Sequence, residues 1–331
     1  METSWEQSRA HGRTAVPIAL SGARAQGVTA VGARGAGVSH RSQGGASTPQ
    51  AEARTQLRRL GLRAVKGLGQ HFLVDSGVLS TIVDASELKA GDTIVEVGPG
   101  LGVLTAELIR TARKVVAVEI DANLAAALER RFSDTPQLTV LNADILDLEP
   151  AELLGSEGPT TGAMHAYKVA ANLPYSVGSP ILRHFLESEC KPTIMVVMLQ
   201  KEVAQRMVAG PGHMSLLGVG VQLYGRPRII DYVPARCFYP EPKVDSAIVR
   251  IDVYPRPALG VGDIAGFFEV VKAGFSAPRK QLRNSLTLGL DLTPPEAECL
   301  LHDAGIAAKR RPQTLSLEEW AQLHEAFANR R

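Results

Sequence analysis

Two short motifs in this chain combine residue types that could do chemistry. The first, Val95-Glu96-Val97-Gly98-Pro99-Gly100-Leu101-Gly102, ends a β-branched run in glycines, which let a backbone turn tightly and approach a ligand. The second, Asn172-Leu173-Pro174-Tyr175, joins an amide, a backbone restricted by proline and an aromatic ring. We interpret the first as a turn for a nucleoside cofactor and the second as a clamp for a planar amine. Their order and spacing predict methylation of an exocyclic base nitrogen by S-adenosylmethionine.

The glycine spacing and two acids define the predicted cofactor site. Gly98, Gly100 and Gly102 depart from the G-x-G-x-x-G pattern of dinucleotide sites, which favours a ligand without pyrophosphate. Glu119 ends the next expected strand, where a carboxylate can accept hydrogen bonds from both ribose hydroxyls. Asp144 ends the strand after that and can accept from an adenine amino group. Each acid alone is more often a helix cap or a surface residue. Gly98, Glu119 and Asp144 lie at the ends of three successive expected strands, and together they predict an adenosine site.

Alternating elements must position these residues. Short β-branched runs and helical spacings alternate along the chain, and this pattern predicts a doubly wound, mostly parallel, Rossmann-like sheet of the α/β class. In such sheets ligands bind beyond the carboxyl ends of the strands. Ser179-Pro180 is predicted to open a helix, with serine as N-cap and proline at the first position. Strands are expected at 92–97, 114–119, 138–141, 167–171 and 193–199, and helices at 103–113, 123–131 and 181–189.

Composition divides the chain into three expected regions. Residues 1–54 are rich in Gly, Ala, Ser and Arg and almost lack periodicity. We interpret them as a disordered leader, or as the result of a start codon assigned too far upstream. An organellar transit peptide is the alternative. Residues 55–258 are expected to form the S-adenosylmethionine-binding catalytic domain. From residue 259 strand patterns give way to helical ones, which predicts a helical RNA-contacting domain over 259–331.

Bulk properties exclude several classes of protein. The net charge of the 331 residues is only +2, so nucleic acid must be bound through local patches. Three separated cysteines form neither a C-x-x-C pair nor a disulfide framework, which fits a reducing cytoplasm. No apolar run approaches the ~20 residues that span a bilayer. We expect a cytoplasmic monomer that needs no metal.

Seven segments carry a family resemblance. Residues 60–331 resemble the small-subunit ribosomal RNA adenine dimethyltransferases, whose motifs match 66–73, 98–102, Glu119, 142–144, 172–175, 238–246 and 279–286. The resemblance implies that His71, Leu73, Gly98, Glu119, Asp144 and Asn172 line the cofactor pocket. Relatives often carry Asn at position 71. The His71 side chain can present a ring nitrogen to the pocket or simply pack.

The second motif suggests how an adenine amine could be activated. Adenine N6 is a poor nucleophile because its lone pair is delocalised into the ring. We hypothesise that the Asn172 side-chain oxygen and the Leu173 carbonyl accept its two hydrogens, while Pro174 restricts Leu173. Tyr175 can stack on the base, an interaction worth ~1–3 kcal/mol, and the resemblance implies that Phe238 covers the other face. The target must be flipped out or unpaired to reach such a site.

Basic residues near these motifs are the expected RNA contacts. The resemblance places two clusters beside the pocket, and we interpret a third, Lys309 to Arg311, as a solvated face. The first cluster comprises Arg58, Arg59, Arg63 and Lys66, and the second Arg279, Lys280 and Arg283, with Lys243 as a further candidate phosphate contact.

The resemblance implies N6,N6-dimethylation of two adjacent adenosines near the 3′ end of small-subunit (16S) ribosomal RNA, during ribosome biogenesis. The expected partner is that RNA in an immature small subunit, and the dimethyl product is carried by the resemblance alone. One alternative is a large-subunit RNA methyltransferase of the erythromycin-resistance type. A second is a non-catalytic assembly factor. The chain shows no target-recognition insert, which disfavours a DNA adenine methyltransferase.

Overall fold

The structure, a computed structural model, describes residues 48–59, 61, 70–155, 166–175 and 177–330. Residues 48–331 form one compact unit. Lys66 and Arg63 lie outside the described residues, as do residues 1–47 of the predicted leader. Helix α1 (Pro49–Arg59) already begins inside the predicted leader, so the boundary at residue 54 was placed too late.

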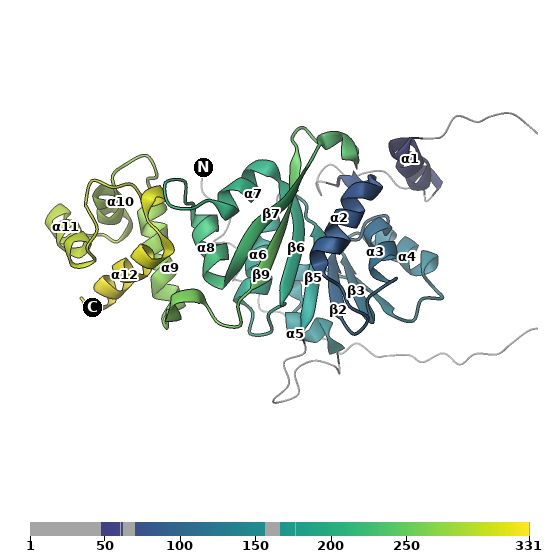
Figure 1. Cartoon of the computed structure of the whole chain (residues 1–331), viewed down its shortest axis with the longest axis horizontal. Helices are drawn as coiled ribbons and strands as arrows, with labels where there is room; N and C mark the ends of the chain where they lie inside the picture. Colours follow the sequence, from purple (N-terminus) through teal and green to yellow (C-terminus); the bar gives the residue numbers. More distant parts are fainter. Residues whose placement is uncertain (1–47, 60, 62–69, 156–165, 176, 331) are drawn as a thin grey trace, which may run out of the picture. The chain divides into compact units, whose positions relative to one another are not determined.

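A seven-stranded sheet forms the centre of the unit, in the order β4-β3-β2-β5-β6-β9-β7 (Figure 1). The first five of these strands are parallel, which confirms the predicted doubly wound sheet. The last two pair antiparallel and fall where no strand bounds were predicted. The strands are β2 (Thr93–Val97), β3 (Lys114–Glu119), β4 (Leu138–Asn142), β5 (Tyr167–Asn172), β6 (Ile194–Gln200), β7 (Gly225–Val233) and β9 (Ser246–Val253).

Two short strands lie apart from this sheet. Strand β1 (Phe72–Leu73) pairs antiparallel with β8 (Phe238–Tyr239) and faces Leu73 with Phe238. Segments that are far apart in the chain therefore meet beside the glycine turn, since a Cβ at Gly100 would lie 3.1 Å from the Phe72 ring.

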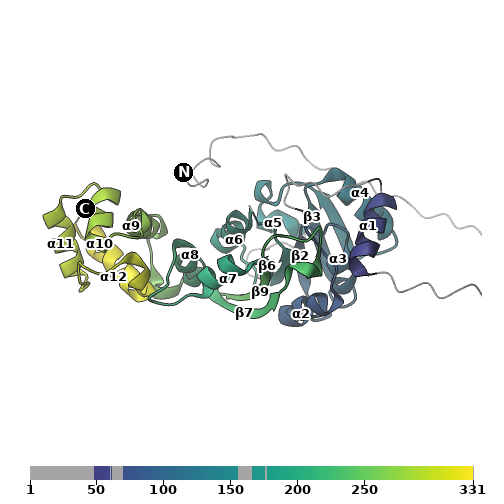
Figure 2. The same cartoon turned by 90° about the horizontal axis from the view of Figure 1, so that it is seen from above.

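Helices cover both faces of the large sheet, as Figure 2 shows from above. On one face α2 (Ser76–Ser86) and α3 (Val103–Leu108) bury Ile82, Leu104 and Leu108 against the strands. The opposite face is covered by α5 (Pro150–Leu153), α6 (Gly178–Glu187), α7 (Lys201–Val208) and α8 (Leu216–Tyr224), while α4 (Ala122–Arg131) packs on β3 and β4.

Two predicted helix ends differ from the structure. Helix α3 ends at Leu108 rather than Arg113, because the N–H of Arg113 already donates to the Asp92 carbonyl at the start of the sheet. The predicted N-cap at Ser179 is wrong. Val177 caps α6 without a side-chain bond, and Ser179 lies inside the first turn.

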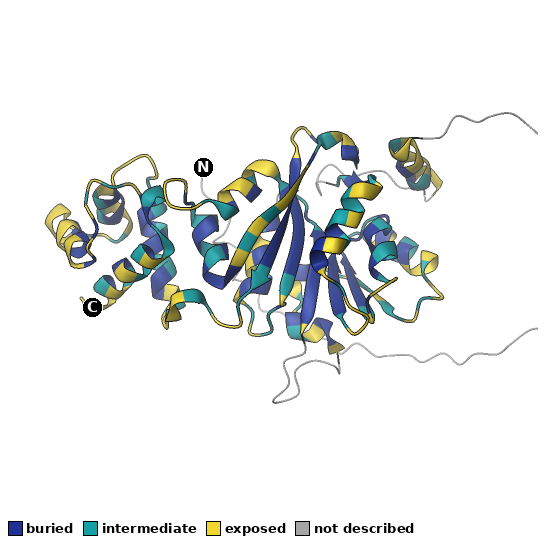
Figure 3. Ribbon diagram, in the orientation of Figure 1, coloured by how far each residue is buried: buried dark blue, intermediate teal, exposed yellow. Residues whose placement is uncertain are grey.

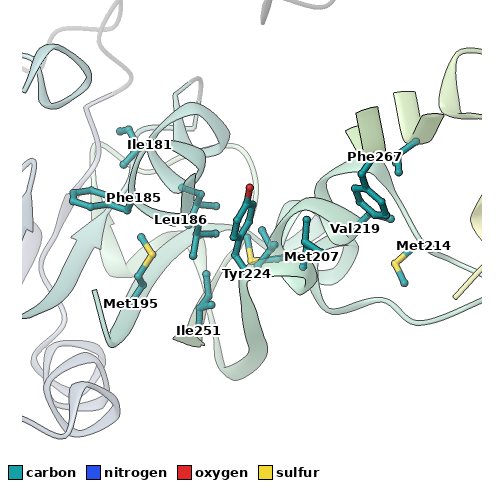
Figure 4. Close-up of a cluster of buried hydrophobic side chains, with 14 of the residues drawn as sticks. Ile181, Phe185, Leu186, Met195, Met207, Met214, Val219, Tyr224, Ile251 and Phe267 are labelled. Carbon is teal, nitrogen blue, oxygen red and sulfur yellow. The ribbon is translucent and has the colours of Figure 1, made fainter. Parts of the chain in front are cut away.

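The predicted C-terminal helices are present, but they share their core with the sheet. Buried side chains run from the strands into α8 and on to the last helices (Figure 3). Figure 4 shows part of this cluster, from Phe185 and Met195 to Phe267. The helices are α9 (Ile264–Phe275), α10 (Leu282–Gly289), α11 (Pro294–Asp303) and α12 (Leu317–Ala328). Within the described residues, no helix is both long and apolar enough to cross a bilayer.

Candidate active site

The glycine turn follows β2 and has the backbone geometry that glycine was predicted to supply. Gly98, Gly100 and Gly102 have φ of +67°, +56° and +72°, a region in which other residues are strained. A Cβ at Gly98 would meet nothing within 4 Å, so this position faces open space. At Gly102 a Cβ would lie 2.4 Å from Leu128 Cδ1, which makes that glycine a packing requirement. The turn thus leaves bare backbone facing open space at Gly98.

Glu119 lies at the carboxyl end of β3 and is only 4% exposed. One carboxylate oxygen accepts from the N–H of Gly100 at 3.0 Å and the other from the N–H of Asp121 at 3.0 Å. Burial raises the pKa of Glu119, and these two donors oppose that shift. A carboxylate has about four acceptor positions, so two remain for the hydroxyls of a ribose.

Asp144 lies beyond the end of β4, where one of its oxygens caps a short 3-10 helix by accepting from the N–H of Leu146 at 3.0 Å. Its carboxylate keeps further acceptor positions for an adenine amino group. Asn142 bridges the neighbouring strand ends, because its side-chain N–H donates to the Glu119 carbonyl at 2.8 Å. The two acids are therefore held at one rim, as their positions at successive strand ends predicted.

A cavity of about 230 Å³ opens at this rim. Every predicted cofactor-binding residue lines it, together with three residues of the amine clamp. The predicted residues that line the cavity are His71, Leu73, Gly98, Gly100, Glu119, Asp144, Asn172, Leu173, Pro174 and Tyr175.

The sequence prediction missed several lining residues. The most unusual is Glu96, a carboxyl group 1% exposed within β2, which accepts from the Thr105 hydroxyl at 2.6 Å. Burial raises the pKa of Glu96 to about 8, and the charge of Glu119 adds to that shift. Burial therefore favours the protonated form of Glu96 in the folded protein. Further lining residues are Gln70, Phe72, Ile120, Ile145, Val177 and Ile181. Glu96 lies inside the glycine motif, but its apolar neighbours gave no signal of a separate role.

Asn172 ends β5, with its side-chain N–H donating to the His71 carbonyl at 2.9 Å. That bond fixes which end of the amide is the acceptor, because Nδ2 is occupied and Oδ1 remains. The next residue is held as well, since the N–H of Leu173 donates to the Met198 carbonyl at 3.0 Å. The geometry thus presents a side-chain oxygen next to a fixed backbone, as the amine clamp requires.

Tyr175 and His71 stack beside this clamp, with ring centroids 5.6 Å apart and planes at 26°. The Tyr175 hydroxyl lies 2.8 Å from the Ser246 hydroxyl, which fixes the ring orientation. His71 Nδ1 lies 2.7 Å from the Pro240 carbonyl, and since a carbonyl only accepts, Nδ1 is the protonated nitrogen. The side chain of His71 thus orders the wall through Tyr175 and Pro240, while its backbone orients Asn172.

Phe238 does not line the cavity. It is 1% exposed and packs with Leu73, Ile82 and Cys237 in the core between the sheet and α2. The pairing of β1 with β8 sets this orientation, because it faces Phe238 with Leu73. The expected position over the second face of a bound base is therefore not the one that Phe238 occupies in this structure.

The candidate RNA contacts that the structure describes do not line the cavity. Lys243, Arg279 and Lys280 are exposed, as the prediction requires. Arg283 instead forms an ion pair with Glu298 at 2.5 Å.

Comparison with known proteins identifies the family. The profile described as ribosomal RNA adenine dimethylase matches residues 61–329. The chain belongs to this family. The predicted resemblance, enzyme class and methyl donor, S-adenosylmethionine, are thereby confirmed.

Relatives and solved structures agree with the assignment. A ribosomal RNA small subunit methyltransferase A from Dehalococcoides mccartyi is 48% identical over 281 residues, which cover 84% of this chain and 94% of the relative. A protein of the same name from Bacillus mycoides is 40% identical, covering 82% and 94%. A dimethyladenosine transferase from Plasmodium falciparum has the same fold, with a TM-score of 0.64, 24% identity and coverage of 78% and 98%. The 23S rRNA methyltransferase ErmE has a TM-score of 0.60 and 28% identity, and the match covers 78% of this chain and 99% of ErmE.

Proposed function

We propose that this protein transfers methyl groups from S-adenosylmethionine to N6 of two adjacent adenosines near the 3′ end of small-subunit ribosomal RNA. The observation that carries the proposal is the shared cavity, because the glycine turn and the Asn172–Tyr175 motif line the same space. Relatives at 40–48% identity bear the name of small-subunit ribosomal RNA methyltransferases, which supports this substrate.

The residues of the cavity fit the methyl donor. Glu119 is positioned for the ribose hydroxyls and Asp144 for the adenine amino group, while bare backbone at Gly98 gives room for close approach. When bound, the donor supplies an activated methyl group on a sulfonium. Asn172 lines the same cavity, so a donor held by Glu119 and Asp144 would present this group to the acceptor motif.

On the acceptor side, Asn172 Oδ1 and the Leu173 carbonyl accept the two N6 hydrogens of the target adenine. These bonds favour a localised lone pair on N6, and Tyr175 stacks on the ring. As the new N–C bond forms, the S–C bond of the sulfonium would break and leave a neutral thioether. No strong base is needed, because the N6 proton becomes acidic in this step and passes to water. Positioning and fixed dipoles therefore supply most of the rate enhancement.

The natural partner in this proposal is an immature small subunit, on which the protein acts as a monomer in the cytoplasm. Likeness to ErmE keeps a large-subunit target as the second candidate. The 40–48% identity to small-subunit enzymes favours the first, against 28% to ErmE. A role in assembly without catalysis can coexist with either target.

The test is to incubate the protein with labelled S-adenosylmethionine and small subunits from a strain that lacks this methylation. Mass spectrometry of the ribosomal RNA should then find N6,N6-dimethyladenosine at two neighbouring positions near the 3′ end. Large subunits serve as the matched control. Label on large-subunit RNA alone would replace the proposal by the second candidate, and label on neither would reject both.

A further inference from the structure

An exposed aromatic side chain lies on the sheet edge beyond the catalytic motif. Tyr232, the next-to-last residue of β7, is 46% exposed, and the Lys201 ammonium lies 5.0 Å from its ring centroid. We propose that Tyr232 and Lys201 bind the RNA next to the target adenosine. The ring stacks on an unpaired base, and the ammonium contacts a phosphate. This inference rests on the proposed function and adds a substrate contact to it.

Strand register places this pair on the same edge as the active site. Strand β9 runs antiparallel to both neighbours, so Ser246 lies opposite Gln200 of β6 and Val233 of β7. The Ser246 hydroxyl lies 2.8 Å from that of Tyr175, and Tyr232 is the residue beside Val233. Strands β5 and β7 are three positions apart, or about 14 Å at ~4.8 Å per strand. That distance suits a flanking nucleotide rather than the target itself.

A bulge in β7 aims the tyrosine. The register shifts by one residue between Ile229 and Asp231, and an extra residue reverses the face on which later side chains lie. Tyr232 therefore pairs with Ala247 and lies on the face that α7 covers, where the Lys201 ammonium lies over its ring. Without the extra residue its side chain would point to the opposite face. Bulges at sheet edges commonly re-aim a side chain toward a functional site.

The local charges leave the cations available. Lys201 and Lys243 are both exposed, and neither is in an ion pair within the described part of the chain. The neighbouring carboxylates already have backbone partners. Asp231 accepts from the N–H of Tyr232 at 2.8 Å, and Asp245 accepts from a backbone N–H at 3.0 Å. A half-exposed aromatic ring beside lysines that form no ion pair among the described residues is a combination with which proteins bind single-stranded nucleic acid.

The contact is tested by steady-state kinetics on under-methylated small subunits and on a protein-free fragment of the same RNA. Tyr232→Ala should raise the KM for both RNA substrates about tenfold, the loss expected for one stacked base, and leave the KM for S-adenosylmethionine unchanged. Tyr232→Phe keeps the aromatic face and should behave like the wild type. Lys201→Ala should raise the KM for RNA and make it less dependent on salt. The matched control is Leu288→Ala, a side chain 68% exposed on α10, which should change neither KM.

Each alternative outcome has its own meaning. An unchanged KM for RNA in Tyr232→Ala overturns the inference. A rise seen with subunits but not with the protein-free fragment also overturns it, because the occupant would then be a ribosomal protein. If the wild-type protein methylates neither substrate, the proposed function fails instead, and that result is visible before any variant is compared.

Discussion

The direction in which the catalytic amide points is set by a residue far away in the chain. Asn172 donates to the carbonyl of His71, 101 residues earlier, so its oxygen is the end left for a substrate amine. The sequence predicted Asn172 as an acceptor from its motif, but a motif cannot reveal a partner at such a separation. The tertiary contact is what turns a side chain that can be both donor and acceptor into an acceptor.

Removing that acceptor should affect the chemical step. We expect Asn172→Ala to lower kcat for methyl transfer about 10²–10³-fold, the cost of losing one preorganised polar group at a reacting centre. The dissociation constant for small subunits should stay within about twofold. Single-turnover rates and subunit co-sedimentation measure the two effects. Asn329→Ala, at the exposed end of α12, is the control. A parallel loss of subunit binding would contradict a purely catalytic role.

Glu96 makes stability depend on pH. Its folded-state pKa of about 8 lies above the 4.5 of an unperturbed glutamate, so the folded protein retains a proton that the unfolded chain loses. Unfolding therefore becomes more favourable as pH rises from about 4.5 to about 8. Over that window the change is on the order of 5 kcal/mol.

The isosteric variant Glu96→Gln cannot titrate and should remove this dependence. We expect denaturant unfolding at pH 5, 6.5 and 8 to show that the free energy of unfolding of Glu96→Gln increases relative to that of the wild type as the pH rises. Glu107→Gln, which loses a surface ion pair with Arg110, should follow the wild type at every pH. Parallel pH profiles for Glu96→Gln and the wild type would show that Glu96 is ionised in the folded protein.

The site residues divide into those that the sequence could and could not reveal. Gly98, Glu119 and Asp144 were predictable, because each follows an apolar run and parallel strands end at one rim. Phe238 was not, since the burial of an aromatic in a loop motif depends on the pairing of β1 with β8. Glu96 was not predicted, because the other residues of its strand have the pattern of an apolar core strand and give no sign of a buried carboxyl group.

At the scale of elements, α1 supports the cofactor cavity from outside. Ala53 and Leu57 are its buried residues, and they pack with Phe72, Leu101 and Leu124, all of which line the cavity. The Leu101 carbonyl accepts from Gln56 of α1 at 3.5 Å and from Arg131 of α4 at 2.5 Å. Two helices therefore hold the residue between the second and third glycines of the turn.

Truncating Leu57, a buried side chain of α1, should make the glycine turn less rigid. We expect Leu57→Ala to weaken S-adenosylmethionine binding about tenfold in calorimetry, because the cavity wall loses a buried partner. The KM for RNA should change less than the affinity for the cofactor. Thr55→Ala, on the exposed side of the same helix, is the matched control. Unchanged cofactor affinity in Leu57→Ala would mean that the wall holds its shape without α1.

Helix α1 and strand β7 were not predicted from the sequence, and the reason is similar for both. Helix α1 is polar apart from its two buried residues. These residues can be recognised as buried only when their contact with Phe72 is known. Strand β7 is an edge strand that carries Pro227 and the arginines Arg226 and Arg228, features that protect edges and weaken an alternating pattern. Four of the parallel strands, β2, β3, β5 and β6, were predictable because burial on both faces makes them almost continuously apolar, whereas β4 is an edge strand without a buried residue.

On the scale of the whole molecule, folding gathers positive charge that the composition hides. The N–H of Leu282 donates to the Arg310 carbonyl at 2.7 Å, which brings the segment of Arg279 and Lys280 next to that of Lys309 and Arg311. The side chains of Arg279, Lys280, Lys309 and Arg311 are all exposed. Arg310 itself is only partly exposed and pairs with Glu319. Two clusters that are separate in the sequence thus form one basic surface, although Lys309 to Arg311 was interpreted as merely solvated.

This basic surface should govern RNA affinity without affecting the cofactor. Replacing Arg279, Lys280, Lys309 and Arg311 with Ala should weaken subunit binding more than tenfold, because every neutralised phosphate contributes to affinity by releasing counterions. The slope of log K against log salt should fall by about 0.7–0.9 for each phosphate that is no longer neutralised. Arg283→Ala should cost less, since its guanidinium already pairs with Glu298. Arg330→Ala, which breaks a surface ion pair with Asp303, is the control. Calorimetry with S-adenosylmethionine should give one affinity for all variants, and a matching loss of cofactor binding would show that the charges support the fold rather than the RNA.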